Sequence, residues 1–200
     1  MHYAMTNPLD YNISALNKLS PKKGRVLIAE PFMGDPYFKR AVVLLTEYDK
    51  NGVLGFILNK QINSNISDLL KDFPKFNAPV HIGGPVQSDS LFYIHSQGDF
   101  IKESIQITDQ LYWSGNFSQL KNMIENQEIF PNEIIFFIGY SGWDFKQLEE
   151  EIKEDSWIIS ELKSNNIRDL KDSNLWKNTL NQMGPKLSIL TSFPEDPSLN

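Results

Sequence analysis

Three short apolar runs in the first third of the chain place the strongest constraint on the fold. They cover residues 25–29, 41–46 and 53–58, and turn-forming Gly, Pro, Asp and Asn residues lie between them. Runs of this length, bounded by turn residues, are typical of strands. Residues 49–52 (Asp-Lys-Asn-Gly), between the second and third runs, predict a tight hairpin turn because Asn51 and Gly52 tolerate positive φ angles. Strands joined by turns rather than by helices predict a mixed or antiparallel sheet with attached helices, and so an α+β fold.

The remaining apolar segments divide into strands and amphipathic helices. Short apolar runs predict strands at residues 80–82, 91–95, 134–138 and 157–159. Alternating apolar residues predict an edge strand over residues 101–108. Helical spacing predicts helices near residues 13–19, 64–71, 117–124 and 174–183. A further helix is expected after Asp144, an N-cap residue that Gln147 follows at capping-box spacing.

The chain contains no cysteine, which excludes several kinds of site, and it contains no long apolar segment. Disulfides, zinc–thiolate sites, iron–sulfur clusters and a cysteine nucleophile are all excluded. The longest apolar runs fall far short of the ~20 residues that a membrane-spanning helix requires, and the polar N-terminus lacks the apolar core of a secretory signal. We therefore expect a single-domain cytoplasmic protein that does not associate with membranes.

The acidic charge balance bears on nucleic-acid binding. The formal net charge is −6, and the only arginines are Arg25, Arg40 and Arg168. Phosphate neutralisation by Lys and Arg drives nucleic-acid affinity, and arginine is the commonest reader of bases. An acidic chain with three dispersed arginines therefore argues against direct nucleic-acid binding.

Two glycine-containing segments follow predicted strands and are candidate ligand-binding loops. Residues 83–86 (Gly-Gly-Pro-Val) fit neither a P-loop nor a dinucleotide-binding fingerprint, so they either line a ligand or form a tight turn. Residues 139–143 (Gly-Tyr-Ser-Gly-Trp) are expected to link the central strand to the next helix, whose free N–H groups could hold an anion. They differ from the G-x-S-x-G nucleophile elbow, because Trp143 replaces the last glycine and no histidine is fixed near Ser141. No catalytic residue is therefore assigned.

Two histidines and two loop carboxylates complete the residues that could carry chemistry. His81 and His95 lack the companion ligands and the spacing of a metal site, so we expect neither a metal nor a cofactor. Glu30 and Asp35 each precede a proline. Paired carboxylates can act as general acid and base, but loop carboxylates also cap backbone N–H groups, and we favour the capping role.

Taken in order, several of these segments resemble one bacterial family. They are residues 24–38 (GRVLIAEPFMGDPYF), 40–45 (RAVVLL), 52–59 (GVLGFILN), 83–86, 91–95 and 139–143, followed by 147–149 (QLE) and Trp157. This ordered set resembles the AlgH/YqgE family. Two positions depart from the family pattern, since Tyr48 stands where a histidine is often found and Ser141 where alanine is common.

The resemblance covers residues 24–184 and has consequences for fold and domain limits. It implies a strongly curved mixed sheet, largely antiparallel, with helices packed against it, in a bacterial cytosolic protein. It also implies an N-terminal extension over residues 1–23, a single domain over 24–184 and a C-terminal tail over 185–200.

The resemblance implies no known reaction, because the family is usually described as uncharacterised or as transcriptional regulators. We therefore expect a non-enzymatic regulatory or interaction protein that acts indirectly, through an unidentified protein partner or small ligand. The alternative is a small-ligand or nucleotide-handling protein, enzymes included, that uses the two glycine segments with Arg40 as an anion contact. The candidate ligand-binding or interaction residues are Glu30, Asp35, Arg40, Asn59, Gly83, Gly84, Pro85, Gly139, Tyr140, Ser141, Gly142 and Trp143.

Overall fold

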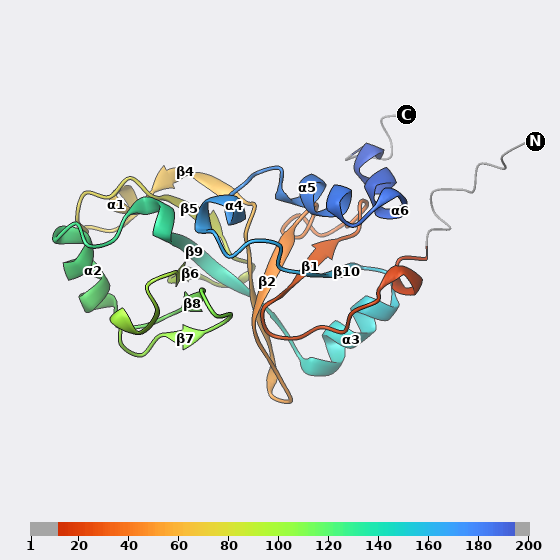
Figure 1. Cartoon of the computed structure of the whole chain (residues 1–200), viewed down its shortest axis with the longest axis horizontal. Helices are drawn as coiled ribbons and strands as arrows, with labels where there is room; N and C mark the ends of the chain where they lie inside the picture. The colour runs from red at the N-terminus through yellow and green to blue at the C-terminus, as the bar shows by residue number, and fades with distance from the viewer. Residues whose placement is uncertain (1–11, 195–200) are drawn as a thin grey trace, which may run out of the picture.

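The architecture is an α+β arrangement in which helices cover a long, open, mixed sheet (Figure 1). The computed structural model describes residues 12–194. Its strands are β1 (Arg25–Ala29), β2 (Val42–Asp49), β3 (Gly52–Ile57), β4 (Gln61–Asn65), β5 (Pro79–Ile82), β6 (Val86–His95), β7 (Ile105–Gln106), β8 (Tyr112–Trp113), β9 (Ile134–Trp143) and β10 (Trp157–Glu161). Its α-helices are α1 (Ile66–Leu69), α2 (Phe117–Glu125), α3 (Phe145–Lys153), α4 (Ile167–Leu170), α5 (Leu175–Gln182) and α6 (Pro185–Ser188).

The sheet topology confirms the predicted fold class. In the described part of the chain the strand order is β10-β1-β2-β3-β9-β6-β8-β7, with β5 paired to both β4 and β9. The pairing of β5 with β9 is parallel, and the other pairs are antiparallel. The sheet is therefore mixed and largely antiparallel, as expected. No helix in the described range is long and apolar enough to cross a membrane.

Strand β9 joins the two halves of the sheet. Residues 134–138 pair with β6 and residues 136–138 with β5, whereas residues 141–143 pair with β3. Successive side chains of a strand point to opposite faces. Accordingly, Phe136 packs in the apolar cluster that includes α2, and Phe137 packs in the cluster that includes α5. This burial on both faces explains the unbroken apolar run that β9 carries in the sequence.

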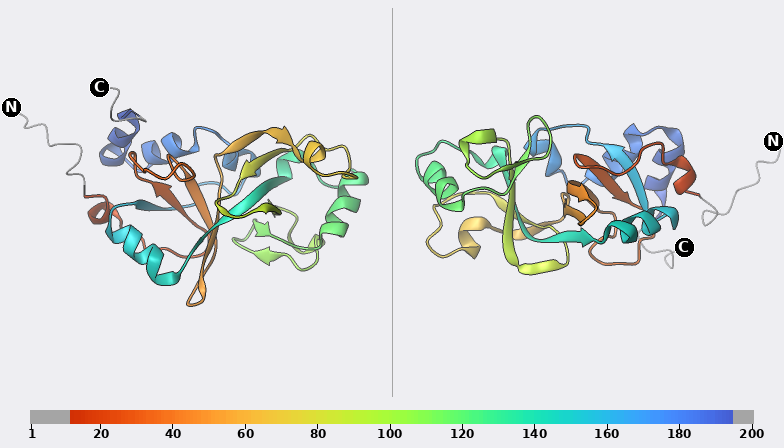
Figure 2. Two further views of the ribbon diagram at one scale, coloured as in Figure 1. Left: turned by 180° about the vertical axis from the view of Figure 1, so that it is seen from behind. Right: turned by 90° about the horizontal axis from the view of Figure 1, so that it is seen from below.

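Alternation along β1 places α3 and α5 on opposite faces of the sheet. Val26 lies in one apolar cluster with Trp176 of α5, whereas Leu27 lies in another with Leu148 of α3. Figure 2 shows these two helices from two further directions. Side chains outside residues 24–184, namely Ile13, Leu187 and Leu190, belong to the same cluster as Val26.

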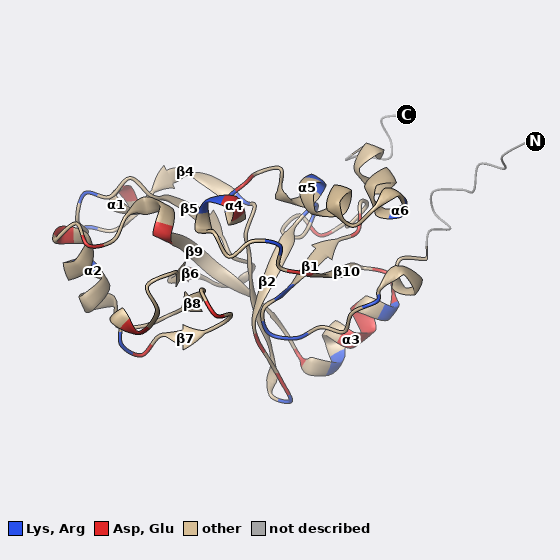
Figure 3. Ribbon diagram, viewed as in Figure 1, with Lys and Arg blue, Asp and Glu red and all other residues tan. Residues whose placement is uncertain are grey.

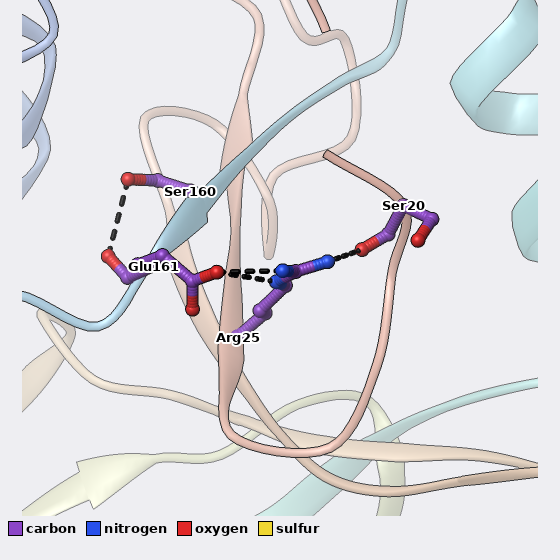
Figure 4. Close-up of polar contacts among 4 residues, drawn as sticks. All are labelled: Ser20, Arg25, Ser160 and Glu161. Atoms are coloured by element: carbon purple, nitrogen blue, oxygen red, sulfur yellow. Dashed lines mark hydrogen bonds and ion pairs between the residues drawn. The ribbon is translucent and has the colours of Figure 1, made fainter. Parts of the chain in front are cut away.

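An ion pair between Arg25 and Glu161 links β1 to β10, the strand at the edge of the sheet. Nε and Nη2 of Arg25 donate to Oε1 of Glu161 at 2.9 and 2.6 Å, and Nη1 donates to the carbonyl oxygen of Ser20 at 2.5 Å (Figure 4). The hydrogen bonds from Arg25 hold the pKa of the Glu161 carboxyl below its ordinary value. Because the Glu161 side chain is 49% exposed, the pair contributes at most about 1 kcal/mol to stability.

The predicted hairpin between β2 and β3 is confirmed, and its turn spans residues 49–52 as expected, but Asn51 lacks the expected positive φ angle. Asp49 and Gly52 are paired, so the two loop residues are Lys50 and Asn51. Gly52 has a positive φ of 147°, whereas Asn51 does not. Oδ1 of Asp49 accepts the Asn51 N–H at 2.6 Å. The side chain of Asp49 therefore closes the turn, in place of the expected left-handed Asn51.

Three other predicted elements are shorter than expected. The helix predicted near residues 13–19 is reduced to one 3₁₀ turn, Ser14–Leu16. The helix predicted over 64–71 is reduced to α1, because residues 61–65 form β4 against β5. The strand predicted over 101–108 is reduced to β7. Ile101 and Ile107 are buried while Ile105 is 39% exposed, so these residues anchor a loop and do not share one strand face.

Candidate functional site

The two glycine segments meet backbone to backbone. A Cβ atom on Gly83 would lie 2.1 Å from the carbonyl oxygen of Gly139, and one on Gly84 would lie 2.3 Å from that of Tyr140. Gly83 also donates its N–H to the carbonyl oxygen of Ile138 at 2.9 Å. The sequence therefore needs glycine here because two chain segments touch. The contact leaves no space for a ligand between them, while Pro85 beside it is exposed.

Residues 139–143 form part of a strand, and the prediction that they form a loop is wrong. Strand β9 continues to Trp143, and Gly142 and Ser141 are register partners of Leu54 and Gly55. Their backbone groups therefore belong to the sheet and do not form an anion site at a helix start. Helix α3 begins where expected, with Asp144 as N-cap and its N–H donating to Oε1 of Gln147 at 3.3 Å.

Ser141 is enclosed by the sheet. Its side chain is fully buried, and Oγ donates to the carbonyl oxygen of Gly83 at 2.9 Å. A nucleophile must reach a substrate, and this hydroxyl does not reach the surface. The burial of this hydroxyl argues against Ser141 as a nucleophile.

Both internal histidines are buried. Nδ1 of His81 donates to the carbonyl oxygen of Leu58 at 2.7 Å. Nε2 of His95 lies 3.1 Å from the carbonyl oxygen of Ser114, and its Nδ1 accepts the Gln97 N–H at 3.2 Å. Burial lowers the pKa of each imidazole to about 4, so both are neutral at pH 7. Among the residues that the structure describes, no group of three or more His, Cys, Asp or Glu could hold a metal ion.

The loop carboxylates cap backbone N–H groups, as we favoured from the sequence. Oε2 of Glu30 accepts the Phe32 N–H at 2.7 Å, and burial raises the pKa of this carboxyl. Oδ1 of Asp35 accepts the N–H groups of Tyr37 and Phe38 at 2.7 and 3.3 Å. Each carboxylate thus shapes the segment between β1 and β2.

Two further candidates, Arg40 and Asn59, are joined by a hydrogen bond. Arg40 has a left-handed φ of 52°, which is uncommon for a residue other than glycine. Asn59 stabilises this bend, because its Nδ2 donates to the Arg40 carbonyl oxygen and its Oδ1 accepts the Val42 N–H, both at 2.9 Å. The Arg40 guanidinium lies 4.9 Å from the centre of the Trp176 ring and donates from Nη2 to the Phe193 carbonyl oxygen at 2.6 Å.

Arg40 and Asn59 line a basic cleft of about 300 Å³. It lies between the ends of the β2–β3 hairpin and the start of α5, and we call it the basic cleft. Its lining residues are Lys39, Arg40, Asn59, Lys60, Ser173, Asn174, Trp176 and Lys177. Every charged residue among them is a cation, although the whole chain carries a net charge of −6. Figure 3 shows the acidic positions of α3 on the other side of the sheet from α5.

Comparison with known proteins identifies the family. A model of the AlgH-like family matches residues 26–188. The chain belongs to the AlgH-like family. It is 41% identical over 186 residues to a UPF0301 protein of Parabacteroides distasonis, covering 92% of this chain and 94% of the relative. It is also 41% identical over 179 residues to a UPF0301 protein of Cytophaga hutchinsonii, covering 89% and 98%.

Solved structures agree with this AlgH-like assignment. The solution structure of the AlgH protein from Pseudomonas aeruginosa matches with a TM-score of 0.68 and 26% identity, over 89% of this chain and 98% of that one. A crystal structure of a protein from Corynebacterium diphtheriae matches with a TM-score of 0.72 and 21% identity, over 90% and 97%. The AlgH-like family is uncharacterised, so membership establishes the fold and not an activity.

The AlgH-like chain has other cavities, and the candidate residues predicted from the sequence line different ones. Tyr140, Gly142 and Trp143 line a different cavity, of about 510 Å³, together with Asp49 and Asp144. A third cavity, of about 550 Å³, is lined by residues of β10, α4 and α5 and carries both acidic and basic groups. The candidates therefore do not converge on one site. Arg40 and Asn59 line the basic cleft, whereas Tyr140, Gly142 and Trp143 line the 510 Å³ cavity.

Sequence reasoning missed three lysines of the basic cleft. Lys39 precedes β2 and Lys60 follows β3, and antiparallel pairing brings the start of one strand to the end of the next. The predicted hairpin therefore contained a signal that could have placed Lys60 near Arg40. Lys177 comes from α5, far along the chain, and only the tertiary structure brings it to the cleft.

Proposed function

We propose that this AlgH-like protein is a non-enzymatic binding protein that holds a small anion in the basic cleft. The observation that carries the proposal is the lining of the cleft, in which Lys39, Arg40, Lys60 and Lys177 are the charged residues. A concentration of cations on an acidic chain favours a ligand of negative charge. Phosphate or carboxylate groups fit this description.

The local chemistry supports anion binding. The planar guanidinium of Arg40 suits the oxygen atoms of phosphates and carboxylates, and lysines add mobile point charges. Ser173 and Asn174, just before α5, add polar groups to the same wall. The partial positive charge at the start of a helix acts in the same direction as the side chains.

The described residues around the cleft support binding rather than catalysis. Its lining contains no His, Asp or Glu that could transfer a proton. Ser141 and both histidines, the groups most suited to nucleophilic or acid–base chemistry, are buried in the sheet. A cytoplasmic setting and an indirect, ligand-dependent regulatory role are part of this proposal.

The test uses NMR spectroscopy of the ¹⁵N-labelled full chain with pyrophosphate as the probe. Trp176 lines the cleft, and its indole N–H donates to the carbonyl oxygen of Ala29 at 2.8 Å, so its ring is held in place. We expect its indole signal to shift on titration and that of Trp113, in the other half of the molecule, to stay unchanged. Absence of a Trp176 shift up to millimolar pyrophosphate would remove the proposal.

A matched pair of charge variants completes the test. Lys177→Gln removes an exposed cation of the cleft, and Lys153→Gln removes an exposed cation of α3 on the other side of the sheet. We expect Lys177→Gln to weaken pyrophosphate binding roughly tenfold, because hydrogen bonds to charged groups contribute this much. We expect Lys153→Gln to bind as the parent chain does. Equal losses in the two variants would indicate non-specific attraction and contradict the proposed site.

A further inference from the structure

An apolar cavity adjoins the basic cleft, because one residue lines both. It has a volume of about 240 Å³ and is lined by Pro36, Tyr37, Lys60 and Ile82. Lys60 lines both, so one residue is common to the basic cleft and the apolar cavity. A ligand that spans the two would place an anion on one side of Lys60 and an uncharged group on the other.

The junction between the two hollows is held by hydrogen bonds. The Ile82 N–H donates to the Lys60 carbonyl oxygen at 2.8 Å, which fixes the two segments that meet there. In the segment between β1 and β2, Asp35 accepts the Tyr37 N–H with Oδ1 at 2.7 Å and the Lys39 N–H with its carbonyl oxygen at 2.9 Å. One turn therefore presents Tyr37 to the apolar cavity and Lys39 to the basic cleft.

The walls of the apolar cavity suit a planar ring. Tyr37 is 38% exposed, and Tyr and Pro rings offer flat apolar surfaces against which an aromatic ring can stack. The cavity is smaller than the cleft and is lined by only a few residues, so it matches a compact group better than an extended hydrocarbon chain.

We propose that the ligand is a nucleotide, with its phosphate in the basic cleft and its base in the apolar cavity against Tyr37. This inference rests on the proposed anion-binding function and adds the ligand class. Lys60 stands between the two parts, where a nucleotide has its ribose. Binding would thus combine charge attraction at Arg40 and Lys177 with base stacking at Tyr37.

The experiment compares AMP, ribose 5-phosphate and octyl phosphate by isothermal titration calorimetry on the full chain. We expect AMP to bind at least tenfold more tightly than ribose 5-phosphate, because stacking on one aromatic side chain contributes about that factor. Tyr37→Ala should lower AMP affinity to that of ribose 5-phosphate and leave ribose 5-phosphate unaffected. Tyr37→Phe should keep the AMP affinity, and Phe100→Ala, which removes an exposed aromatic ring elsewhere, should change nothing.

The outcomes separate this inference from the proposed function. If AMP and ribose 5-phosphate bind equally well and Lys177→Gln weakens both, the nucleotide inference is wrong and the anion function stands. If octyl phosphate binds more tightly than AMP and Tyr37→Ala weakens it, the apolar cavity takes an acyl group and the nucleotide inference is again wrong. If none of the three binds, both proposals fail.

Discussion

The hydroxyl of Ser141 donates a hydrogen bond to the carbonyl oxygen of Gly83 at 2.9 Å, inside the sheet. The bond joins the two glycine segments that the sequence places 58 residues apart. The Gly83 carbonyl oxygen also accepts the N–H of Ile57 from β3 at 3.0 Å. The segment that follows β5 is therefore connected to both β3 and β9 at one backbone crossing, and Ser141 has a structural role there.

The first prediction concerns that hydroxyl. Ser141→Ala should lower the free energy of unfolding by about 1 kcal/mol, because one buried hydrogen bond is lost while Gly83 keeps its bond from Ile57. Urea unfolding measures the change. Pyrophosphate affinity should stay the same, since Ser141 lies outside the basic cleft. A variant of normal stability with weakened pyrophosphate binding would instead connect Ser141 with the ligand.

The second prediction concerns the close crossing itself. Gly83→Ala should cost more than about 4 kcal/mol or prevent folding, because its Cβ would lie 2.1 Å from a rigid backbone oxygen. Gly34→Ala is the matched control, since a Cβ there meets no atom within 4 Å, and its effect should stay within about 0.5 kcal/mol. Urea unfolding and circular dichroism compare the two variants. Equal stability of the two would show that the crossing is not tight.

The third prediction is a loss of stability in mild acid caused by the buried histidines. Burial lowers the folded-state pKa of His81 and of His95 from 6.5 to about 4, and the charge of Lys171 also opposes protonation of His81. As the pH falls through 6.5, the unfolded chain therefore binds protons before the folded chain does. The contribution of the two neutral histidines to the free energy of unfolding is therefore fully present above pH 6.5 and is lost as the pH falls toward 4. At pH 5 the free energy of unfolding should be lower by about 2 kcal/mol per histidine.

Urea unfolding at pH 7.5 and pH 5.0 checks this dependence. His95→Gln removes one of the two titrating groups, so its free energy of unfolding should fall less between these pH values than that of the parent chain. A parent chain that is equally stable at both pH values would contradict the buried, neutral state of the histidines.

The fourth prediction concerns Glu151 of α3. Its Oε2 accepts the indole N–H groups of Trp143 and Trp157 at 2.9 and 2.8 Å. Glu151→Ala leaves both donors without this acceptor and should cost about 2–6 kcal/mol, since each buried unsatisfied group costs about 1–3 kcal/mol. Glu150→Ala, an exposed position on the same helix, should cost less than about 0.5 kcal/mol. Urea unfolding followed by tryptophan fluorescence measures both variants.

Local patterns in the sequence determined many of the elements. The apolar run of β1, the stripe of α2 and the Asp144 cap of α3 each depend on residues that are neighbours in the chain, and all three form where expected. The resemblance supplied the curved mixed sheet. The capping roles of Glu30 and Asp35 were predicted because carboxylates in loops often accept backbone N–H groups.

The candidate site required contacts between distant segments. Residues 139–143 look like a loop because glycines and a serine follow an apolar run, yet pairing with β3 extends the strand through Trp143. The sequence could not reveal this pairing, because the same local pattern is compatible with a loop when no partner strand is present.

The sequence by itself determined the fold class, the strands and helices with strong periodicity, and the AlgH-like pattern. These follow from side-chain chemistry over a few neighbouring residues, where propensity and alternation act. Only the tertiary structure brings the backbones of Gly83 and Gly139 into contact. Likewise, only the tertiary structure places Lys177 and Arg40 in the lining of one cleft. Such meetings depend on how the sheet curves and where α5 packs, and these are set by the whole core rather than by any single segment.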